Sequence, residues 1–209
     1  MTPAEFTSIL KSQGQDVSRE TLSALEAYAA LLTKWQARIN LVAKDSLADL
    51  WRRHFLDSAQ LVPLLPPGNE PITDLGSGAG FPGLVLAILT GRQVHLVDSD
   101  QRKGVFLTEA ARVTGVAARV QVHTGRIETL KAWPAPIVTA RALASLSQLL
   151  DWAAPYLTAQ TVCLFLKGAK AEEELTEAAR SWTMETERHR SLTDPSGVIL
   201  KLHHIQRRG

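Results

Sequence analysis

The chain has 209 residues, of which 45% are hydrophobic and 21% are charged, with a formal net charge of +2. These values are typical of an ordinary globular protein with one domain, or one domain and a helical extension. Its single cysteine, Cys163, excludes a disulfide framework and a thiolate-rich zinc site. We see no signal peptide and no apolar run near the ~20 residues of a membrane helix, so we expect a cytoplasmic protein without a membrane segment.

The N-terminal part is predicted to be helical. Ser18 is the expected N-cap of a helix whose apolar residues recur at helical spacing over residues 22–39. A second stripe, over residues 47–62, predicts another helix. The prolines that follow cannot continue a helix, so we expect a helical extension, residues 1–66, packed on a second unit, residues 71–209.

Strand-like and helix-like segments alternate after the prolines. Strands separated by helices of ~10–15 residues predict βαβ units and a parallel sheet. The last two strands flank the turn Thr-Asp-Pro-Ser-Gly and predict an antiparallel hairpin at a sheet edge. We therefore expect an α/β, Rossmann-like fold with a mostly parallel seven-stranded sheet. The strands are expected at residues 71–75, 93–98, 119–125, 136–143, 160–168, 185–192 and 197–206, and the helices between them at 82–91, 101–115, 145–157 and 169–182.

A glycine-rich turn follows the first strand, in the stretch ITDLGSGAGFPG. Glycines at a strand-to-helix turn permit positive φ and let a ligand approach the backbone closely. The spacing Gly78-x-Gly80-x-x-Gly83 matches the dinucleotide fingerprint, and Asp98 lies about 20 residues farther on, as that fingerprint requires. A nicotinamide dinucleotide is therefore one candidate ligand, and a tight turn without a ligand is another interpretation.

Two further features of this turn favour S-adenosylmethionine. Asp74 precedes the alternating glycines, Gly78 among them, and its carboxylate repels a pyrophosphate but attracts a cationic sulfonium with a free amino group. Pro82 lies in the first turn of the helix, where a dinucleotide needs free N–H donors. We therefore expect Asp74 and Gly78 to belong to a site for a methyl donor, with a dinucleotide-dependent oxidoreductase as the alternative.

Later strands end in polar residues at the edge where open α/β sheets bind ligands. Asp98 ends the second strand and is expected to accept hydrogen bonds from the ribose hydroxyls of the cofactor. Glu128 follows the third strand and is a candidate partner for the adenine amino group. Arg141 ends the fourth strand and is a candidate contact for a cofactor carboxylate or an RNA phosphate.

Several stretches together resemble the GidB family, also called RsmG. They are LGSGAGFPG, HLVDS with KGVFL after it, GRIE, RALASL and LFLKG, with WQARINLVA and RRHFLDS before them. The resemblance implies a class I methyltransferase fold and methyl transfer from S-adenosylmethionine to guanine N7 in a loop of 16S ribosomal RNA near the decoding centre. Carried over by position, it places cofactor contacts on Gly76, Phe81, Ile127, Glu128 and Arg141.

The expected chemistry needs no catalytic acid or base. Guanine N7 has a lone pair and no proton, so alignment of the reactants carries the rate. The sequence lacks an Asn/Asp-Pro-Pro-aromatic tetrad after the fourth strand, and Cys163 is expected to pack in the core. We also expect no metal site, because the histidines show no ligand spacing and His203 and His204 are predicted to point to opposite faces of a strand.

The expected partner is 16S ribosomal RNA or the small ribosomal subunit, bound by a monomer. RNA loops are held by cations on phosphates and by aromatic stacking, but Trp35 and Trp51 lie on apolar stripes and are predicted to pack in the core. The modest net charge favours a folded or partly assembled particle over naked RNA. A non-catalytic ribosome-binding module is the alternative from another class. Besides Arg141, the candidate phosphate contacts are Arg52, Arg53, Lys103, Lys167 and Arg207.

Overall fold

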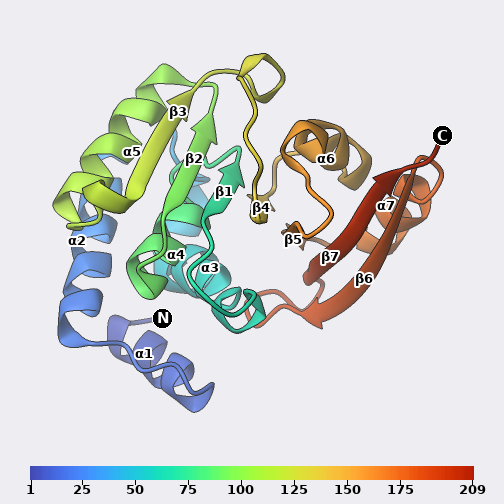
Figure 1. Ribbon diagram of the computed structural model, residues 1–209. Coiled ribbons are helices and arrows are strands. Elements are labelled where there is room, and N and C mark those ends of the chain that lie inside the picture. Colours follow the sequence, from blue (N-terminus) through green and yellow to red (C-terminus); the bar gives the residue numbers. More distant parts are fainter.

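The computed structural model describes residues 1–209 and is built on a seven-stranded sheet with helices on both faces (Figure 1). The strand order is β3-β2-β1-β4-β5-β7-β6. The first five strands in this order run parallel, whereas β7 is antiparallel to both β5 and β6. The predicted α/β fold with a C-terminal hairpin is therefore confirmed. The strands are β1 (Ile72–Leu75), β2 (Val94–Asp98), β3 (Val120–Thr124), β4 (Ile137–Arg141), β5 (Val162–Lys167), β6 (Trp182–Arg190) and β7 (Val198–Arg207).

Seven α-helices accompany the strands. They are α1 (Pro3–Ser12), α2 (Arg19–Gln36), α3 (Asp57–Ala59), α4 (Gly83–Thr90), α5 (Gln101–Val113), α6 (Leu146–Ala153) and α7 (Ala171–Ala178). Helices α2, α4 and α5 pack together on one face of the sheet, and α6 packs with α7 on the other. None of the helices combines the length and the hydropathy that a membrane span requires.

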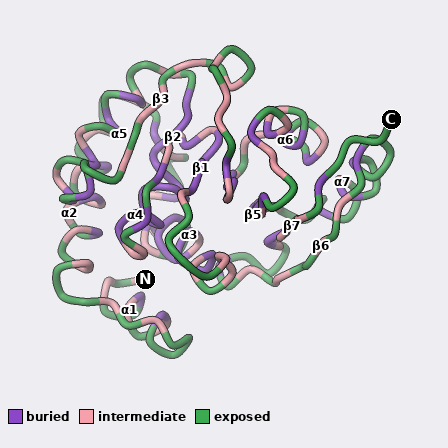
Figure 2. Tube along the Cα trace, in the orientation of Figure 1, coloured by how far each residue is buried: buried purple, intermediate pink, exposed green.

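Strand side chains alternate between two buried cores, as a period of two residues requires. Ile72 and Leu96 pack in the core shared with α2, α4 and α5, while Leu75 and Val97 pack in the core below α6. All four residues of β1 are buried, and the buried positions concentrate along the inner strands (Figure 2). This burial on both faces is typical of a central parallel strand.

The strand order positions the ligand edge. Strand β1 pairs with β2 on one side and with β4 on the other. The chain therefore leaves the centre of the sheet in opposite directions before and after this point. Such a reversal leaves a crevice at the carboxyl ends of the two central strands, where ligands of open α/β sheets bind.

The N-terminal segment packs directly on the sheet. Ser18 caps α2 as predicted, because its hydroxyl accepts from the Thr21 N–H at 3.1 Å. Tyr28 of α2 donates a hydrogen bond to the Ala79 carbonyl, and its ring stacks on Phe81 at 5.3 Å between centroids. Residues 1–66 thus share one hydrophobic core with the unit that follows, and α2 touches the glycine turn itself.

The segment predicted to be helical, residues 47–62, is helical but is not one regular α-helix. The segment is a 3-10 turn η1 (Lys44–Asp49), a π-helix η2 (Trp51–Leu56) and then the short α3. In the π-helix the Asp57 N–H reaches back five residues to the Arg52 carbonyl. Apolar spacing indicated helix here, but tertiary packing selected a wider turn, and such turns are frequent at functional sites.

The expectation for the paired histidines is wrong. His204 has a φ of +52°, and the register between β6 and β7 shifts between Thr183 and Glu185. A bulge of this kind breaks the alternation of side chains along a strand. The rings of His203 and His204 therefore lie together, with their Nδ1 atoms 3.2 Å apart, instead of on opposite faces.

Candidate functional site

A cavity of about 1160 Å³ opens at the carboxyl ends of the central strands. One side is formed by the glycine turn after β1 and by the loops after β2 and β3. The other side is formed by the N-terminal segment and the turn between β6 and β7. Seven of the predicted cofactor contacts line this one cavity, although they come from four separate strand ends: Gly76, Gly78, Phe81, Asp98, Ile127, Glu128 and Arg141.

The glycine turn leaves open space at one position. Gly76 has a φ of +68°, and a Cβ there would lie 2.5 Å from Leu143. Gly78 has a φ of +57°, but the nearest atom to its Cβ position is the Gly76 carbonyl oxygen, at 3.9 Å. Gly76 is therefore required for packing, whereas Gly78 keeps the wall of the cavity bare. A ligand can approach the backbone there, which fits the cradle expected for a cofactor.

Asp98 holds the glycine turn in place from the end of β2. Its Oδ2 accepts from the Gly78 N–H at 2.8 Å, and its Oδ1 accepts from the Asp100 N–H at 2.9 Å. Asp100, not Asp98, caps α5, because the Asp100 carboxylate accepts from the Arg102 N–H. The side chain of Asp98 is thus free of a capping role, and it remains part of the cavity wall.

Asp74 is placed differently from the prediction. Its side chain is fully buried and does not line the cavity. Its Oδ1 accepts from the Thr139 hydroxyl at 2.7 Å, and its Oδ2 accepts from the Gly83 N–H at 3.2 Å. Burial raises the pKa of Asp74 to about 6, against the lowering effect of these hydrogen bonds. The residue therefore anchors the start of α4 behind the turn instead of contacting a ligand directly.

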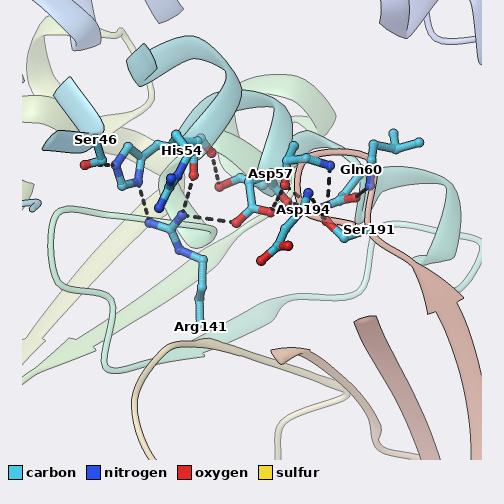
Figure 3. A network of polar contacts seen from close by, with 11 residues as sticks. Ser46, His54, Asp57, Gln60, Arg141, Ser191 and Asp194 are labelled. Carbon is cyan, nitrogen blue, oxygen red and sulfur yellow. Dashed lines mark hydrogen bonds and ion pairs between the residues drawn. The ribbon is translucent and has the colours of Figure 1, made fainter. Parts of the chain in front are cut away.

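Arg141 is held by the N-terminal segment (Figure 3). Its Nη1 donates to the Arg53 carbonyl at 3.0 Å and lies 3.2 Å from Asp57 Oδ2, and its Nη2 lies 2.9 Å from His54 Nδ1. The guanidinium also lies over the Phe81 ring, 5.1 Å from its centroid. The arginine at the end of β4 is thus fixed at the cavity wall by residues that precede β1.

The hydrogen bonds of His54 define its tautomer. The Ser46 hydroxyl donates to the Ala43 carbonyl at 2.6 Å, so it accepts from His54 Nε2–H at 2.8 Å. Nδ1 is then the acceptor for Arg141. Burial, with the charges of Arg141 and Arg53, lowers the pKa of His54 to about 3, so the imidazole is neutral near neutral pH.

Sequence reasoning missed His54 and Asp57 as site residues. Asp57 also accepts from the Thr193 hydroxyl at 2.6 Å, which connects the turn between β6 and β7 to the same network. The available signal was the stretch RRHFLDS, in which the imidazole and the carboxylate are three residues apart and so share one helical face. Arg126, in the loop after β3, also lines the cavity and was missed.

The predicted phosphate contacts divide into two groups. Arg53 and Lys103 line the cavity together with Arg141. Lys167 lines it too, but its Nζ lies 2.6 Å from Glu174 and donates to the Ala144 carbonyl at 2.7 Å. Its charge is therefore paired within the protein, and its contact with a phosphate stays a prediction.

Arg52 and Arg207 lie outside the cavity. Arg207 is the last residue of β7. Because β7 runs antiparallel to β5, Arg207 lies near the amino-terminal ends of the parallel strands, whereas the glycine turn lies at their carboxyl ends. Its guanidinium pairs with Asp151 at 3.3 Å and lies over the Trp182 ring. The structure thus does not place these two arginines at the site where the sequence predicted them to bind phosphate.

Cys163 lies in the core as expected, whereas Trp35 and Trp51 are half-buried and pack against it. Cys163 is fully buried, and burial raises the pKa of its thiol well above the usual range, so a thiolate nucleophile is excluded at neutral pH. Trp51 stacks on Phe55 and Trp35 packs edge-on against Phe106, both against the first core.

Comparison with known proteins decides the family. The model of the GidB family, described as rRNA small subunit methyltransferase G, matches residues 21–202. The chain belongs to this family. It is 54% identical over 207 residues to the ribosomal RNA small subunit methyltransferase G of Rhodospirillum rubrum, covering 99% of this chain and 100% of that protein. It is 58% identical to the protein of the same name from Rhodospirillum centenum, covering 92% of this chain and 88% of that one.

Solved structures support the class I methyltransferase fold. TYW2 of M. jannaschii, solved in complex with AdoMet, superposes with a TM-score of 0.56 at 15% identity, covering 82% of this chain and 80% of that chain. At this identity the likeness concerns the fold alone. The resemblance to the GidB family and the predicted fold are thus both confirmed.

Proposed function

We propose that this chain transfers a methyl group from S-adenosylmethionine to N7 of a guanine in a 16S ribosomal RNA loop near the decoding centre. The observation that carries the proposal is the shared cavity, in which a bare glycine turn faces a rim of cations. Family membership supplies the reaction class, since relatives about 54% identical are named small subunit rRNA methyltransferases.

The half of the cavity near β1, β2 and β3 fits the cofactor. Gly78 offers open backbone, while Asp98 and Glu128 offer carboxylates beside it. Carboxylates favour a positively charged ligand over a pyrophosphate, which supports S-adenosylmethionine over the dinucleotide alternative. The cofactor supplies an electrophilic methyl group on a sulfonium.

The other half of the cavity fits RNA. Arg53 of the N-terminal segment is a cation on its wall, Arg141 lies between the two halves, and Lys103 and Arg126 add cations after β2 and β3 on the same cavity. Such residues bind phosphates and position a nucleotide without reading its sequence. The N-terminal segment and the turn between β6 and β7 complete this half, so both ends of the chain take part in substrate binding.

Three polar side chains of the cavity are already engaged within the protein, which fits attack by an atom that carries no proton. Both nitrogens of His54 are engaged, one by Ser46 and one by Arg141. Asp98 accepts two backbone N–H groups, and Asp57 is paired with Arg141. None of these groups is poised as a general base, and guanine N7 does not need one. The protein then acts by aligning the reactants and excluding water.

The test is methyl transfer to small subunits from cells that lack this gene. With radiolabelled S-adenosylmethionine, we expect one methyl group per particle, mapped to a guanine N7 by cleavage at the modified base. Naked 16S RNA and a short hairpin serve as parallel substrates, and we expect the intact particle to be preferred. Retention of NAD instead of S-adenosylmethionine would revive the oxidoreductase, and particle binding without methyl transfer would revive the non-catalytic module.

Two further properties follow from this proposal. The action on ribosomal RNA places the protein in the cytoplasm. A monomer of 22.8 kDa is sufficient, because one chain supplies both halves of the cavity. Light scattering during size-exclusion chromatography measures the mass in solution, and a dimer would contradict the second point.

A further inference from the structure

Three metal-binding side chains meet at the hairpin formed by β6 and β7, on a surface that the proposed methyl transfer does not use. Glu185 of β6 pairs in register with His203 of β7, and the bulge brings His204 beside them. The donor atoms of these three residues all lie within 4.8 Å of one another. We propose that Glu185, His203 and His204 bind one zinc ion.

The spacing of the donor atoms matches tetrahedral zinc. His203 Nδ1 lies 3.2 Å from His204 Nδ1 and 3.4 Å from Glu185 Oε2, and His204 Nδ1 lies 3.1 Å from Glu185 Oε1. Ligands held about 2.0–2.1 Å from zinc in tetrahedral geometry are about 3.3–3.4 Å from each other. Each imidazole nitrogen is therefore at about this distance from the other nitrogen and from one oxygen of Glu185, the two rings meeting different oxygens of the same carboxylate, and a further position is open to water.

The surroundings of His203 support the same assignment. A histidine that binds a metal through one nitrogen commonly directs the other N–H to a carboxylate. The Nε2 of His203 lies 3.5 Å from Glu187 Oε1, which also lies 3.1 Å from Lys201 Nζ. The free nitrogen is thus directed to a carboxylate that is itself held in place.

The backbone conformation of His204 makes the cluster possible. In a regular strand, consecutive residues point to opposite faces, so two adjacent histidines cannot share an ion. The φ of +52° at His204 removes this restriction, and such a φ is unfavourable for a residue with a side chain. When one ion binds both converging rings, its binding free energy offsets the cost of this backbone conformation.

The donor set selects the class of ion. Imidazole nitrogens suit zinc, copper and nickel, whereas calcium and magnesium prefer oxygen ligands alone. The site is distinct from the cavity, because Leu202 already pairs with Cys163 near the start of β5, and the two histidines continue beyond it. An ion there would link β6 to β7, the two strands at one side of the sheet.

The test is calorimetric titration of the full chain with ZnCl₂ after treatment with EDTA and dialysis. We expect one zinc ion per chain, not displaced by excess magnesium, and a higher melting temperature with zinc than without it. His204→Ala and Glu185→Gln should each weaken binding by about tenfold or more and abolish the thermal shift. His189→Ala, which removes a histidine of the same hairpin that contacts Glu187 but none of the three donors, should bind zinc nearly as the wild type does.

His204→Gly separates binding from folding. Glycine adopts a φ of +52° without strain, so this variant should be at least as stable as the wild type without zinc and should fail to gain stability with it. The proposal is wrong if the wild type binds no zinc at micromolar concentration. It is equally wrong if His189→Ala loses as much affinity as His204→Ala, or if His204→Gly binds zinc normally.

Discussion

Asp57 and Arg141, 84 residues apart in the chain, form an ion pair of 3.2 Å at the wall of the cavity. Their side chains are 16% and 17% exposed, so the pair is largely shielded from solvent. The second oxygen of Asp57 accepts from Thr193. One carboxylate therefore joins the N-terminal segment, the end of β4 and the turn between β6 and β7.

Removing this carboxylate should destabilise the protein. We expect Asp57→Ala to lower the free energy of unfolding by about 1–3 kcal/mol, because it leaves the Arg141 guanidinium without its counter-charge and the Thr193 hydroxyl without its acceptor. Denaturant unfolding measures the change. The control is Glu109→Ala, which breaks an exposed pair with Arg112 on α5 and should cost less than about 0.5 kcal/mol. Equal losses in the two variants would contradict the role given to Asp57.

His54 should make the wild type sensitive to acid. Its pKa is about 3 in the folded protein, below the usual value of 6.5, so the unfolded chain binds the proton more readily. The stability that depends on neutral His54 is fully present above pH 6.5 and is lost as the pH falls toward 3. Between pH 6.5 and 5, we expect this histidine to lower the free energy of unfolding of the wild type by about 2 kcal/mol.

His54→Gln tests this pH dependence. The amide can accept from Arg141 and donate to Ser46, but it does not titrate in this range. The difference in free energy of unfolding between the wild type and the variant should therefore change by about 2 kcal/mol from pH 6.5 to 5, to the disadvantage of the wild type. A constant difference would show that His54 is protonated in the folded protein or is solvated.

The sheet and its ligand edge could be predicted because their signals are local. Each central strand is an apolar run, and helices α4 and α5 are followed by Gly91 and Gly115, which both adopt positive φ. The ends of the strands then place Asp98, Glu128 and Arg141 at one edge by topology alone. No distance information is needed for that step.

The N-terminal part of the site depends on contacts that the sequence does not encode locally. The π-helix forms where Phe55 packs between Trp51, Tyr28 and Phe81, and two of these partners lie far away in the chain. The bond between His54 and Arg141 spans 87 residues. Spacing rules do not connect such residues, and they likewise do not show that Asp74 is buried and does not line the cavity.

Asp74 should have the opposite pH dependence to His54. Its folded pKa of about 6 is above the ordinary value of 3.8, so the folded state binds the proton more tightly than the unfolded chain does. Stability from this group is present below pH 3.8 and is lost as the pH rises to 6, by up to about 3 kcal/mol. Asp74→Asn removes that loss while keeping an acceptor for the Gly83 N–H.

Unfolding curves of Asp74→Asn and the wild type at pH 4 and pH 7 test this prediction. We expect the free energy of unfolding of the variant, relative to that of the wild type, to increase as the pH rises. Parallel pH profiles would indicate that Asp74 ionises in the folded protein without loss of stability, because water or a cation near Thr139 stabilises its charge.

Asp98 should affect the cofactor more than the fold. Asp98→Ala removes a charge-assisted acceptor from the cavity wall and should weaken binding of S-adenosylmethionine by about 1.5–3 kcal/mol, measured by calorimetry. Asp98→Asn keeps an acceptor for Gly78 and should weaken it less. Asp100→Ala, two residues away, removes the cap of α5 and should reduce stability by about 1 kcal/mol with the cofactor affinity unchanged. An unchanged Kd in Asp98→Ala would assign the ribose to another carboxylate.

Gly78 and Gly91 provide a matched pair for the cradle itself. Both adopt positive φ, +57° and +69°, and at both positions a Cβ meets no atom closer than 3.9 Å. Alanine at either position should therefore cost a similar amount of stability, about 1–2 kcal/mol. Only Gly78 lines the cavity.

Gly78→Ala and Gly91→Ala should therefore differ in their affinity for S-adenosylmethionine and have similar free energies of unfolding. We expect Gly78→Ala to weaken S-adenosylmethionine binding at least tenfold, because the methyl group occupies the space where the ligand approaches the backbone, and Gly78→Val to weaken it further. Gly91→Ala should bind the cofactor as the wild type does. Normal binding by Gly78→Ala would place the cofactor elsewhere in the cavity, because backbone strain is the same in both variants and only the position of the added carbon differs.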